Sequence, residues 1–119
     1  MAVTFYWYPK CSTCRKAKKW LDDHQVDYRA VHIAENPPSR EELEKLYRQS
    51  GLELKKFFNT SGQKYRELGV KERLKTASES ELLDLLASDG MLIKRPLVTD
   101  GSQVTVGFSE EEFEKHWLP

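Results

Sequence analysis

The chain has 119 residues, of which 39% are hydrophobic and 32% charged, a composition that suits one domain with an apolar core. Nineteen basic residues balance nineteen acidic ones, so the net charge gives no argument for nucleic-acid binding. No apolar run approaches the ~18 residues of a membrane helix, no secretory signal is visible, and two cysteines cannot form a disulfide-rich scaffold. We therefore expect a cytoplasmic protein.

The N-terminal part of the chain predicts a β-α-β unit. Residues 3–8 are β-branched and aromatic and stop at a proline, which is typical of a strand. Residues 12–24 are good helix formers, and Ser12 or Thr13 can cap their start. Residues 28–33 predict a second strand, parallel to the first. Spacings of three and four predict one buried face of the helix, formed by Cys14, Ala17, Trp20 or Leu21, and His24.

The middle of the chain, from about residue 39 to 89, predicts helices and contains no strand candidate. Ser39, which has a glutamate three residues later, opens the first helix with a capping-box pattern. Residues 65–70 predict another short helix, closed by Gly69. A leucine-rich helix then begins at Ser78 or Ser80.

The C-terminal part of the chain predicts a hairpin and a last helix. Residues 96–99 are expected to form a strand, Asp100-Gly101 a hairpin turn, and residues 104–106 the returning strand. Ser109, again with a glutamate three residues later, caps the last helix.

The predicted order is β-α-β, a helical block, then β-β-α. This order is the thioredoxin-type arrangement, an α/β fold with a mixed four-stranded sheet and helices packed on it. We expect a single thioredoxin-like domain over residues 1–119, with a helical insertion at about residues 39–89.

The only two cysteines, Cys11 and Cys14, stand where the first predicted strand gives way to the first predicted helix. The unpaired N–H groups and the dipole of a helix start favour a thiolate over a thiol, and Lys10 and Arg15 add positive charge. Cys11 is therefore predicted to be the nucleophile, and Cys14 the resolving thiol. Cys11 attacks a partner disulfide, and Cys14 then releases the mixed disulfide and leaves the pair oxidised.

Two other interpretations of the cysteines stay open. The pair is also half of a zinc site, but there is no second cysteine pair, and His24, His32 and His116 are scattered along the sequence. Two cysteines can also be plain buried apolar residues. The strand-then-helix context favours the redox interpretation.

The charged residues and the proline near these features also have two interpretations each. Lys16 and Lys19 fit the solvated face of an amphipathic helix. Arg95 supplies either a fork of donors to an oxyanion or carboxylate, or a surface salt bridge. Pro96 belongs at a sheet edge or an irregularity, with a peptide bond that is either trans or cis.

Four segments taken together resemble the arsenate reductase/Spx family: Tyr8–Ala17, Asn36–Ser39, Tyr65–Val70 and Lys94–Val98. The resemblance runs from about residue 3 to residue 118. It implies a thioredoxin-like fold with an inserted helical subdomain, and a cis Pro96 that faces the cysteines. The candidate catalytic residues are Cys11, Cys14 and Arg95, and the candidate substrate-binding residues are Lys10, Ser12, Thr13, Arg15 and Pro96.

The two branches of that family imply different functions. Glutaredoxin-linked arsenate reductases hold arsenate with three arginines; Arg95 matches one, but Asn59 and Gly107 stand at the other two positions, so efficient arsenate reduction is not predicted. The Spx branch uses the Cys-x-x-Cys pair as a redox switch and binds the C-terminal domain of the RNA polymerase alpha subunit. The first hypothesis is a thiol–disulfide oxidoreductase, and the alternative is an Spx-like regulator.

The expected partner is a thiol reductant, namely glutathione, glutaredoxin or the thioredoxin system. The RNA polymerase alpha subunit is the partner under the alternative. We expect a monomer that holds no cofactor or metal and contacts neither nucleic acid nor membrane directly.

Overall fold

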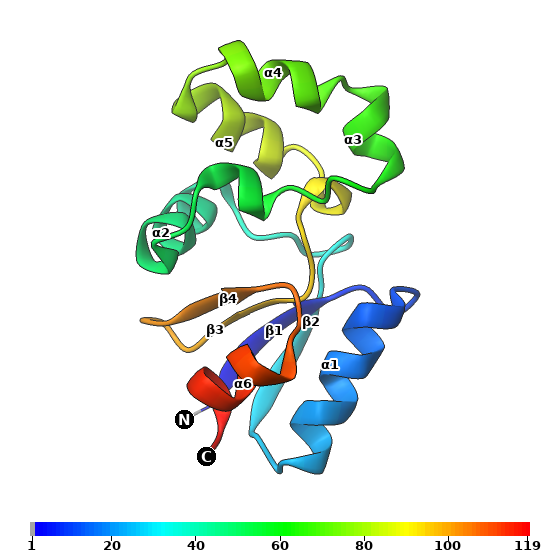
Figure 1. The fold of residues 1–119 in the computed structure, drawn as a ribbon, viewed down its shortest axis with the longest axis vertical. Coiled ribbons are helices and arrows are strands. Elements are labelled where there is room, and N and C mark those ends of the chain that lie inside the picture. The colour runs from blue at the N-terminus through cyan, green and yellow to red at the C-terminus, as the bar shows by residue number, and fades with distance from the viewer. Residues whose placement is uncertain (1) are drawn as a thin grey trace. The chain divides into compact units, whose positions relative to one another are not determined.

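A computed structural model describes residues 2–119 (Figure 1). The chain divides into two compact units, one formed by residues 2–32 with 95–119 and the other by residues 33–94. Within residues 2–119, none of the helices combines the length and apolar character needed to cross a membrane.

The first unit contains a mixed four-stranded sheet with the order β2-β1-β3-β4. Strand β1 pairs in parallel with β2 and antiparallel with β3, and β3 pairs antiparallel with β4. The α/β fold class and the mixed four-stranded sheet expected from the sequence are confirmed. The strands are β1 (Val3–Trp7), β2 (Tyr28–His32), β3 (Leu97–Thr99) and β4 (Val104–Val106).

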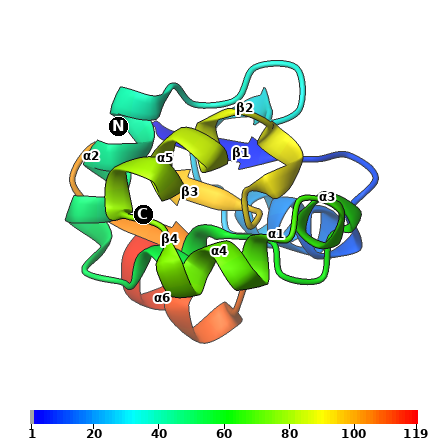
Figure 2. The ribbon, with the colours of Figure 1, turned by 90° about the horizontal axis from the view of Figure 1, so that it is seen from above.

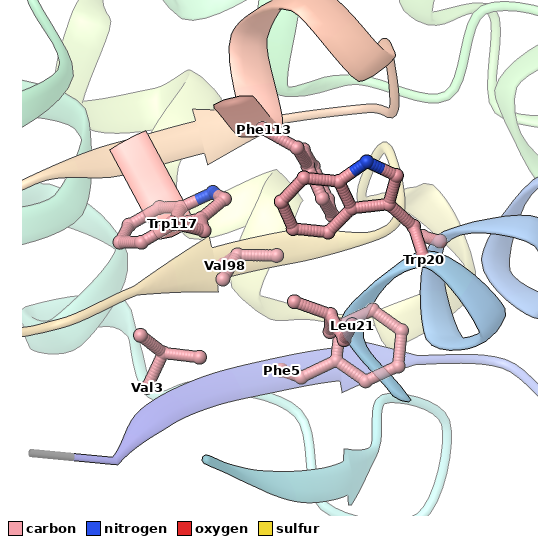
Figure 3. Close-up of a cluster of buried hydrophobic side chains, with 8 residues drawn as sticks. Val3, Phe5, Trp20, Leu21, Val98, Phe113 and Trp117 are labelled. Carbon is pink, nitrogen blue, oxygen red and sulfur yellow. The ribbon is translucent and has the colours of Figure 1, made fainter. Parts of the chain in front are cut away.

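The core of this unit lies between one face of the sheet and two helices, α1 (Ser12–Asp23) and α6 (Glu110–Trp117). Figure 3 shows the indole rings of Trp20 from α1 and Trp117 from α6 gathered above the strands. Burial of these apolar surfaces is the main stabilising contribution to the unit. The cluster consists of Val3, Phe5, Ala17, Trp20, Leu21, Val98, Phe113 and Trp117.

One residue of the predicted buried face of α1 is placed differently. Cys14, Ala17, Trp20 and Leu21 are buried as expected, whereas His24 is exposed. His24 follows the last residue of the helix, where its ring stacks on Trp20 at 4.0 Å between centroids. The sequence pattern predicts a helix that continues to His24, whereas α1 ends one residue earlier, at Asp23.

The second unit is helical, with α2 (Arg40–Ser50), α3 (Gln63–Glu67), α4 (Val70–Thr76) and α5 (Glu79–Ala87). Figure 2 shows α2 and α5 side by side, and ion pairs join them, including Arg40 Nε to Asp84 Oδ1 at 2.7 Å. Short 3-10 helices cover Leu54–Phe57 and Gly90–Leu92.

The sequence predicts one short helix closed by Gly69; the structure contains that helix, α3, and also a second helix, α4, which was not predicted. Helix α3 ends before Gly69, and α4 begins directly after it at Val70. Gly69 has φ 62°, a left-handed conformation that a glycine adopts easily and that breaks the helical path between them. The second unit also contains an isolated antiparallel bridge between Phe58 and Ile93, whereas the sequence predicts no strand over residues 39–89.

The N-terminus of α5 carries a capping box that makes a testable contribution to stability. The Ser78 hydroxyl accepts a hydrogen bond from the Glu81 N–H at 3.1 Å, and the Glu81 carboxylate accepts one from the Ser78 N–H at 3.2 Å. We expect Ser78→Ala to lower the free energy of unfolding by about 1 kcal/mol, measured by urea denaturation. Ser78→Asp keeps a capping oxygen and is expected to be near wild type. Equal stability of the alanine variant and the wild type would contradict this assignment.

Candidate active site

Helix α1 starts at the tight turn that follows strand β1. Cys11 has extended backbone angles, φ −88° and ψ 119°, and occupies the N-cap position. Its N–H donates to the Tyr8 carbonyl at 2.9 Å, and its own carbonyl accepts the Arg15 N–H at 3.0 Å. The expectation that Ser12 or Thr13 caps the helix is therefore wrong, because both residues already lie in the first helical turn.

The two cysteines lie in different environments although only two residues separate them. Both are free thiols; Cys11 is half-buried, whereas Cys14 is fully buried, with 0% of its surface exposed. The position of Cys14 one turn into the helix turns its side chain toward the interior of the unit, because the buried face of α1 runs through it. One sulfur is thus accessible to a partner and the other is not.

The pKa of Cys11 lies below its ordinary value. Partial burial by itself would raise this pKa. The backbone N–H of Cys14, the Cys14 thiol, the charge of Arg95 and the backbone N–H of Thr13 all lower it, and together they outweigh burial. The Cys11 side chain does not form a regular N-cap hydrogen bond. The backbone N–H groups of the first helical turn nevertheless favour its thiolate form.

The pKa of Cys14 is shifted in the opposite direction, and burial raises it to about 12. The hydrogen bond with Cys11 and the charge of Cys11 raise the pKa further, whereas a backbone hydrogen bond from Tyr8 and the charge of Arg95 lower it. The proton shared between the two sulfurs therefore belongs to Cys14. Of the two sulfurs, that of Cys11 is therefore the one whose surroundings favour the thiolate form.

Arg95 and Pro96 reach the site from the start of strand β3. The Arg95–Pro96 peptide bond is cis, as the family resemblance implied, and Pro96 is buried. The Pro96 carbonyl accepts the Gly107 N–H at 2.8 Å. The Arg95 guanidinium lies over the ring of Tyr8, with its carbon 5.3 Å from the ring centroid.

The remaining candidate residues lie at the surface around the N-terminus of α1. Lys10, Ser12, Thr13 and Arg15 are all exposed. The Arg15 guanidinium donates to the Pro9 carbonyl at 3.3 Å. Sequence reasoning favoured the charges of Lys10 and Arg15 as the electrostatic part of the site, whereas the charge that lowers the pKa of both thiols is that of Arg95.

Tyr8 is the residue of this site that sequence reasoning gave no role. Its carbonyl holds the turn before Cys11, and its ring contacts Arg95. The one signal in the sequence was its place as the last residue before the proline that ends the first strand. Nothing in that signal connects it with Arg95, which is far away along the chain.

Within residues 2–119, no group of three or more His, Cys, Asp or Glu side chains is arranged so that it could hold a metal ion. The arrangement of Cys11, Cys14 and Arg95 supports thiol chemistry. A stabilised thiolate, a protonated thiol hydrogen-bonded to it and a nearby guanidinium can form and resolve a mixed disulfide.

We expect Arg95→Gln to raise the pKa of Cys11. The positive charge stabilises the thiolate form, so its removal moves the titration toward the ordinary value of a thiol. The curve of alkylation rate against pH should therefore shift to higher pH, and the rate at neutral pH should fall. Lys10→Gln, which removes an exposed charge beside the same cysteine, serves as the control and is expected to cause the smaller shift. A larger shift for Lys10→Gln would contradict the assignment.

Comparison with known proteins places these residues in a wider group. A family model described as ArsC family matches residues 6–116. The uncharacterized protein YusI of Bacillus subtilis (strain 168) is 68% identical over 117 residues, which cover 98% of this chain and 99% of YusI. The global transcriptional regulator Spx of Streptococcus pyogenes serotype M3 is 34% identical over 112 residues, which cover 92% of this chain and 81% of Spx.

Solved structures give the same grouping. SACOL0876 from Staphylococcus aureus COL is 44% identical with a TM-score of 0.89, and the match covers 98% of this chain and 99% of that one. An arsenate reductase from Vibrio cholerae is 30% identical with a TM-score of 0.86, and the match covers 97% of both chains.

Proposed function

The chain belongs to the ArsC family, and from this premise we propose that it is a thiol–disulfide oxidoreductase that uses Cys11 and Cys14. The proposal rests on one observation: the pKa values of the two thiols are shifted in opposite directions. The accessible Cys11 has a lowered pKa, and the buried Cys14, hydrogen-bonded to it, has a pKa of about 12.

The reaction begins with the Cys11 thiolate, which attacks one sulfur of a partner disulfide. A bond forms between Cys11 and that sulfur, the partner's S–S bond breaks, and the other sulfur leaves as a thiol after taking a proton. Cys14 then loses its proton and attacks the Cys11 sulfur. The partner leaves as its second thiol, and the protein keeps a Cys11–Cys14 disulfide that an external thiol reductant must reduce.

The environment of Cys14 supports the order of these steps. While Cys11 is a thiolate, its charge and its hydrogen bond with Cys14 both raise the pKa of Cys14. Once Cys11 is bonded to a partner sulfur, that charge is gone, and the charge of Arg95 still favours the Cys14 thiolate. Cys14 therefore becomes a better nucleophile only after the mixed disulfide has formed.

Glutathione disulfide provides a direct test of this proposal. The wild-type protein is expected to lose two hydrogen atoms by intact-mass measurement, because the mixed disulfide resolves to Cys11–Cys14. Cys14→Ser is expected to accumulate glutathione on Cys11, since the resolving thiol is gone. Cys11→Ser is the matched control and is expected to form neither product at a comparable rate. Absence of an intramolecular disulfide in the wild type would refute the proposal.

Arsenate is not the substrate that we propose. By the family resemblance, Arg95 matches one of three arginines that hold arsenate, and Asn59 and Gly107 occupy the other two positions. Gly107 has φ 83°, a left-handed conformation in which an arginine would be strained. No turnover is expected in an assay that contains arsenate, glutathione and glutaredoxin.

The similarity to Spx supports a second candidate function, that of a redox-sensing regulator. In that case the state of Cys11 and Cys14 would alter binding to the C-terminal domain of the RNA polymerase alpha subunit. A binding assay with that domain, with the protein once reduced and once oxidised, tests this function. Absence of binding in both states would exclude it and leave the oxidoreductase proposal intact.

Three further expectations complete the proposal. The reductant is glutathione, glutaredoxin or the thioredoxin system, which keep thiols reduced in a cytoplasm, where we place the protein. The protein acts as a monomer. The helical unit, Ile33–Lys94, is an insertion into one thioredoxin-like domain, since residues on both sides of it in the sequence build the sheet.

A further inference from the structure

We propose that Tyr8 is a positioning residue whose ring holds the Arg95 guanidinium beside the two thiols and thereby sets the reactivity of Cys11. The proposal rests on the function proposed above, because it assigns a role within the same site. It adds a residue that is not among the catalytic or substrate-binding candidates predicted from the sequence, and it predicts that an uncharged aromatic ring controls the effect of a charge.

The pairing of strands β1 and β3 brings the two residues together. The strands pair antiparallel, with Phe5 opposite Val98 and Tyr6 opposite Leu97. Two further steps of the same register place Arg95 opposite Tyr8, although the strands are no longer paired there. The strand pairing thus places an arginine from the C-terminal part of the chain beside Tyr8, the residue that directly follows β1.

The Tyr8 ring contacts two other side chains, those of Arg95 and His32. The carbon of the Arg95 guanidinium is 5.3 Å from its centroid, within the range of a cation–π interaction. The His32 ring meets the Tyr8 ring edge-on, with centroids 5.6 Å apart and an interplanar angle of 90°. The contact with His32, at the end of the neighbouring strand β2, restricts the ring and so restricts the guanidinium against it.

The backbone of Tyr8 connects this aromatic contact to both cysteines. Its carbonyl accepts the Cys11 N–H at 2.9 Å, and its backbone also hydrogen-bonds Cys14. The ring that holds Arg95 and the peptide groups that fix the thiols therefore belong to one residue.

The charge of Arg95 acts on both thiols from its position over the Tyr8 ring. It is the charged side chain that lowers the pKa of both Cys11 and Cys14. A guanidinium carries its charge on a long flexible side chain, and its effect on a thiolate depends on how closely it is held. The Tyr8 ring contacts the titratable or charged side chains of Arg95 and His32, and the two thiols hydrogen-bond each other.

The test measures the pKa of Cys11 from thiolate absorbance and from alkylation rate against pH. Tyr8→Leu is expected to shift the Cys11 pKa upward, in the same direction as Arg95→Gln. Tyr8→Phe keeps the ring and is expected to titrate like the wild type. The double variant Tyr8→Leu/Arg95→Gln is expected to shift no further than Arg95→Gln alone, because the ring acts through the arginine.

A matched control comes from the helical unit, where the Arg48 guanidinium lies 5.9 Å from the centroid of Tyr47. Tyr47→Leu removes the same kind of aromatic–arginine contact and is expected to leave the Cys11 pKa unchanged. A merely structural role for Tyr8 would lower the melting temperature without moving this pKa. That result, or additive shifts in the double variant, would overturn the proposal.

Two measurements keep this test independent of folding and of the proposed function. In the wild type, NMR should show upfield ring-current shifts for the side-chain protons of Arg95, and their absence would overturn the proposal even if Tyr8→Leu does not fold. Oxidation of the wild type by glutathione disulfide tests the function separately. If the disulfide forms normally while the Tyr8 and Arg95 variants share the wild-type Cys11 pKa, the positioning role fails and the oxidoreductase function stands.

Discussion

Iodoacetamide at less than one equivalent is expected to modify Cys11 over Cys14 by a factor of at least about 10³ at pH 8. The reaction rate follows the thiolate fraction. A pKa of about 12 leaves Cys14 roughly 10⁻⁴ ionised at pH 8. The pKa of Cys11 is lowered from 9.0, so more than about one tenth of it is ionised. The ratio of these two fractions gives the expected selectivity.

Peptide mapping after a short reaction measures the labelling of each cysteine. Unfolding in urea before labelling is the control, since it abolishes both environments and should bring the two rates close together. Comparable labelling of Cys11 and Cys14 in the folded protein would contradict the division of roles on which the proposed mechanism depends. The selectivity should also decrease at high pH, as the Cys14 thiol begins to ionise.

Phe5→Ala is expected to lower the free energy of unfolding by about 3–5 kcal/mol. Phe5 is fully buried in the first unit, at the centre of strand β1. Its ring contacts Trp7 and Tyr28, with centroid distances of 5.9 and 5.6 Å, and it belongs to the cluster under α1 and α6. Truncation removes these contacts and leaves a cavity that the neighbouring rings cannot fill.

Urea denaturation followed by circular dichroism measures this loss. Leu118→Ala provides the control, because Leu118 is 50% exposed and its truncation should change stability by less than about 0.5 kcal/mol. A cost below about 1 kcal/mol for Phe5→Ala would mean that the core of this unit does not depend on the sheet face described above.

Local sequence patterns predicted most of the first unit and the start of α2 in the second unit. A run of β-branched and aromatic residues predicted β1, and a three-and-four spacing predicted most of the buried face of α1. The pairs of serine and glutamate at Ser39 and Ser109 predicted helix starts, and both hydroxyls accept the expected backbone N–H. These features could be predicted because the groups that interact lie within a few residues of one another.

Errors arose where one local pattern supported two structures. Residues 65–70 fit a single helix, but Gly69 adopts a left-handed conformation that separates two. The sequence predicts Ser12 or Thr13 at the N-cap position of α1, but Cys11 occupies it. The turn after β1 closes at Cys11, whose N–H donates to the Tyr8 carbonyl, so that Ser12 is already helical. In both places the residue types are compatible with either structure, and the backbone conformation determines which one forms.

The sequence by itself determined that two thiols stand at the entrance of a helix that follows a strand, because strand, turn and helix are read from neighbouring residues. Only the tertiary structure decided that the environments of the two thiols differ, that the charge of Arg95 acts on both, and that the Arg95 guanidinium lies over the ring of Tyr8. The physical reason is that burial and electrostatic interaction depend on distance in space. The antiparallel pairing of β1 with β3 brings together residues that lie far apart along the chain.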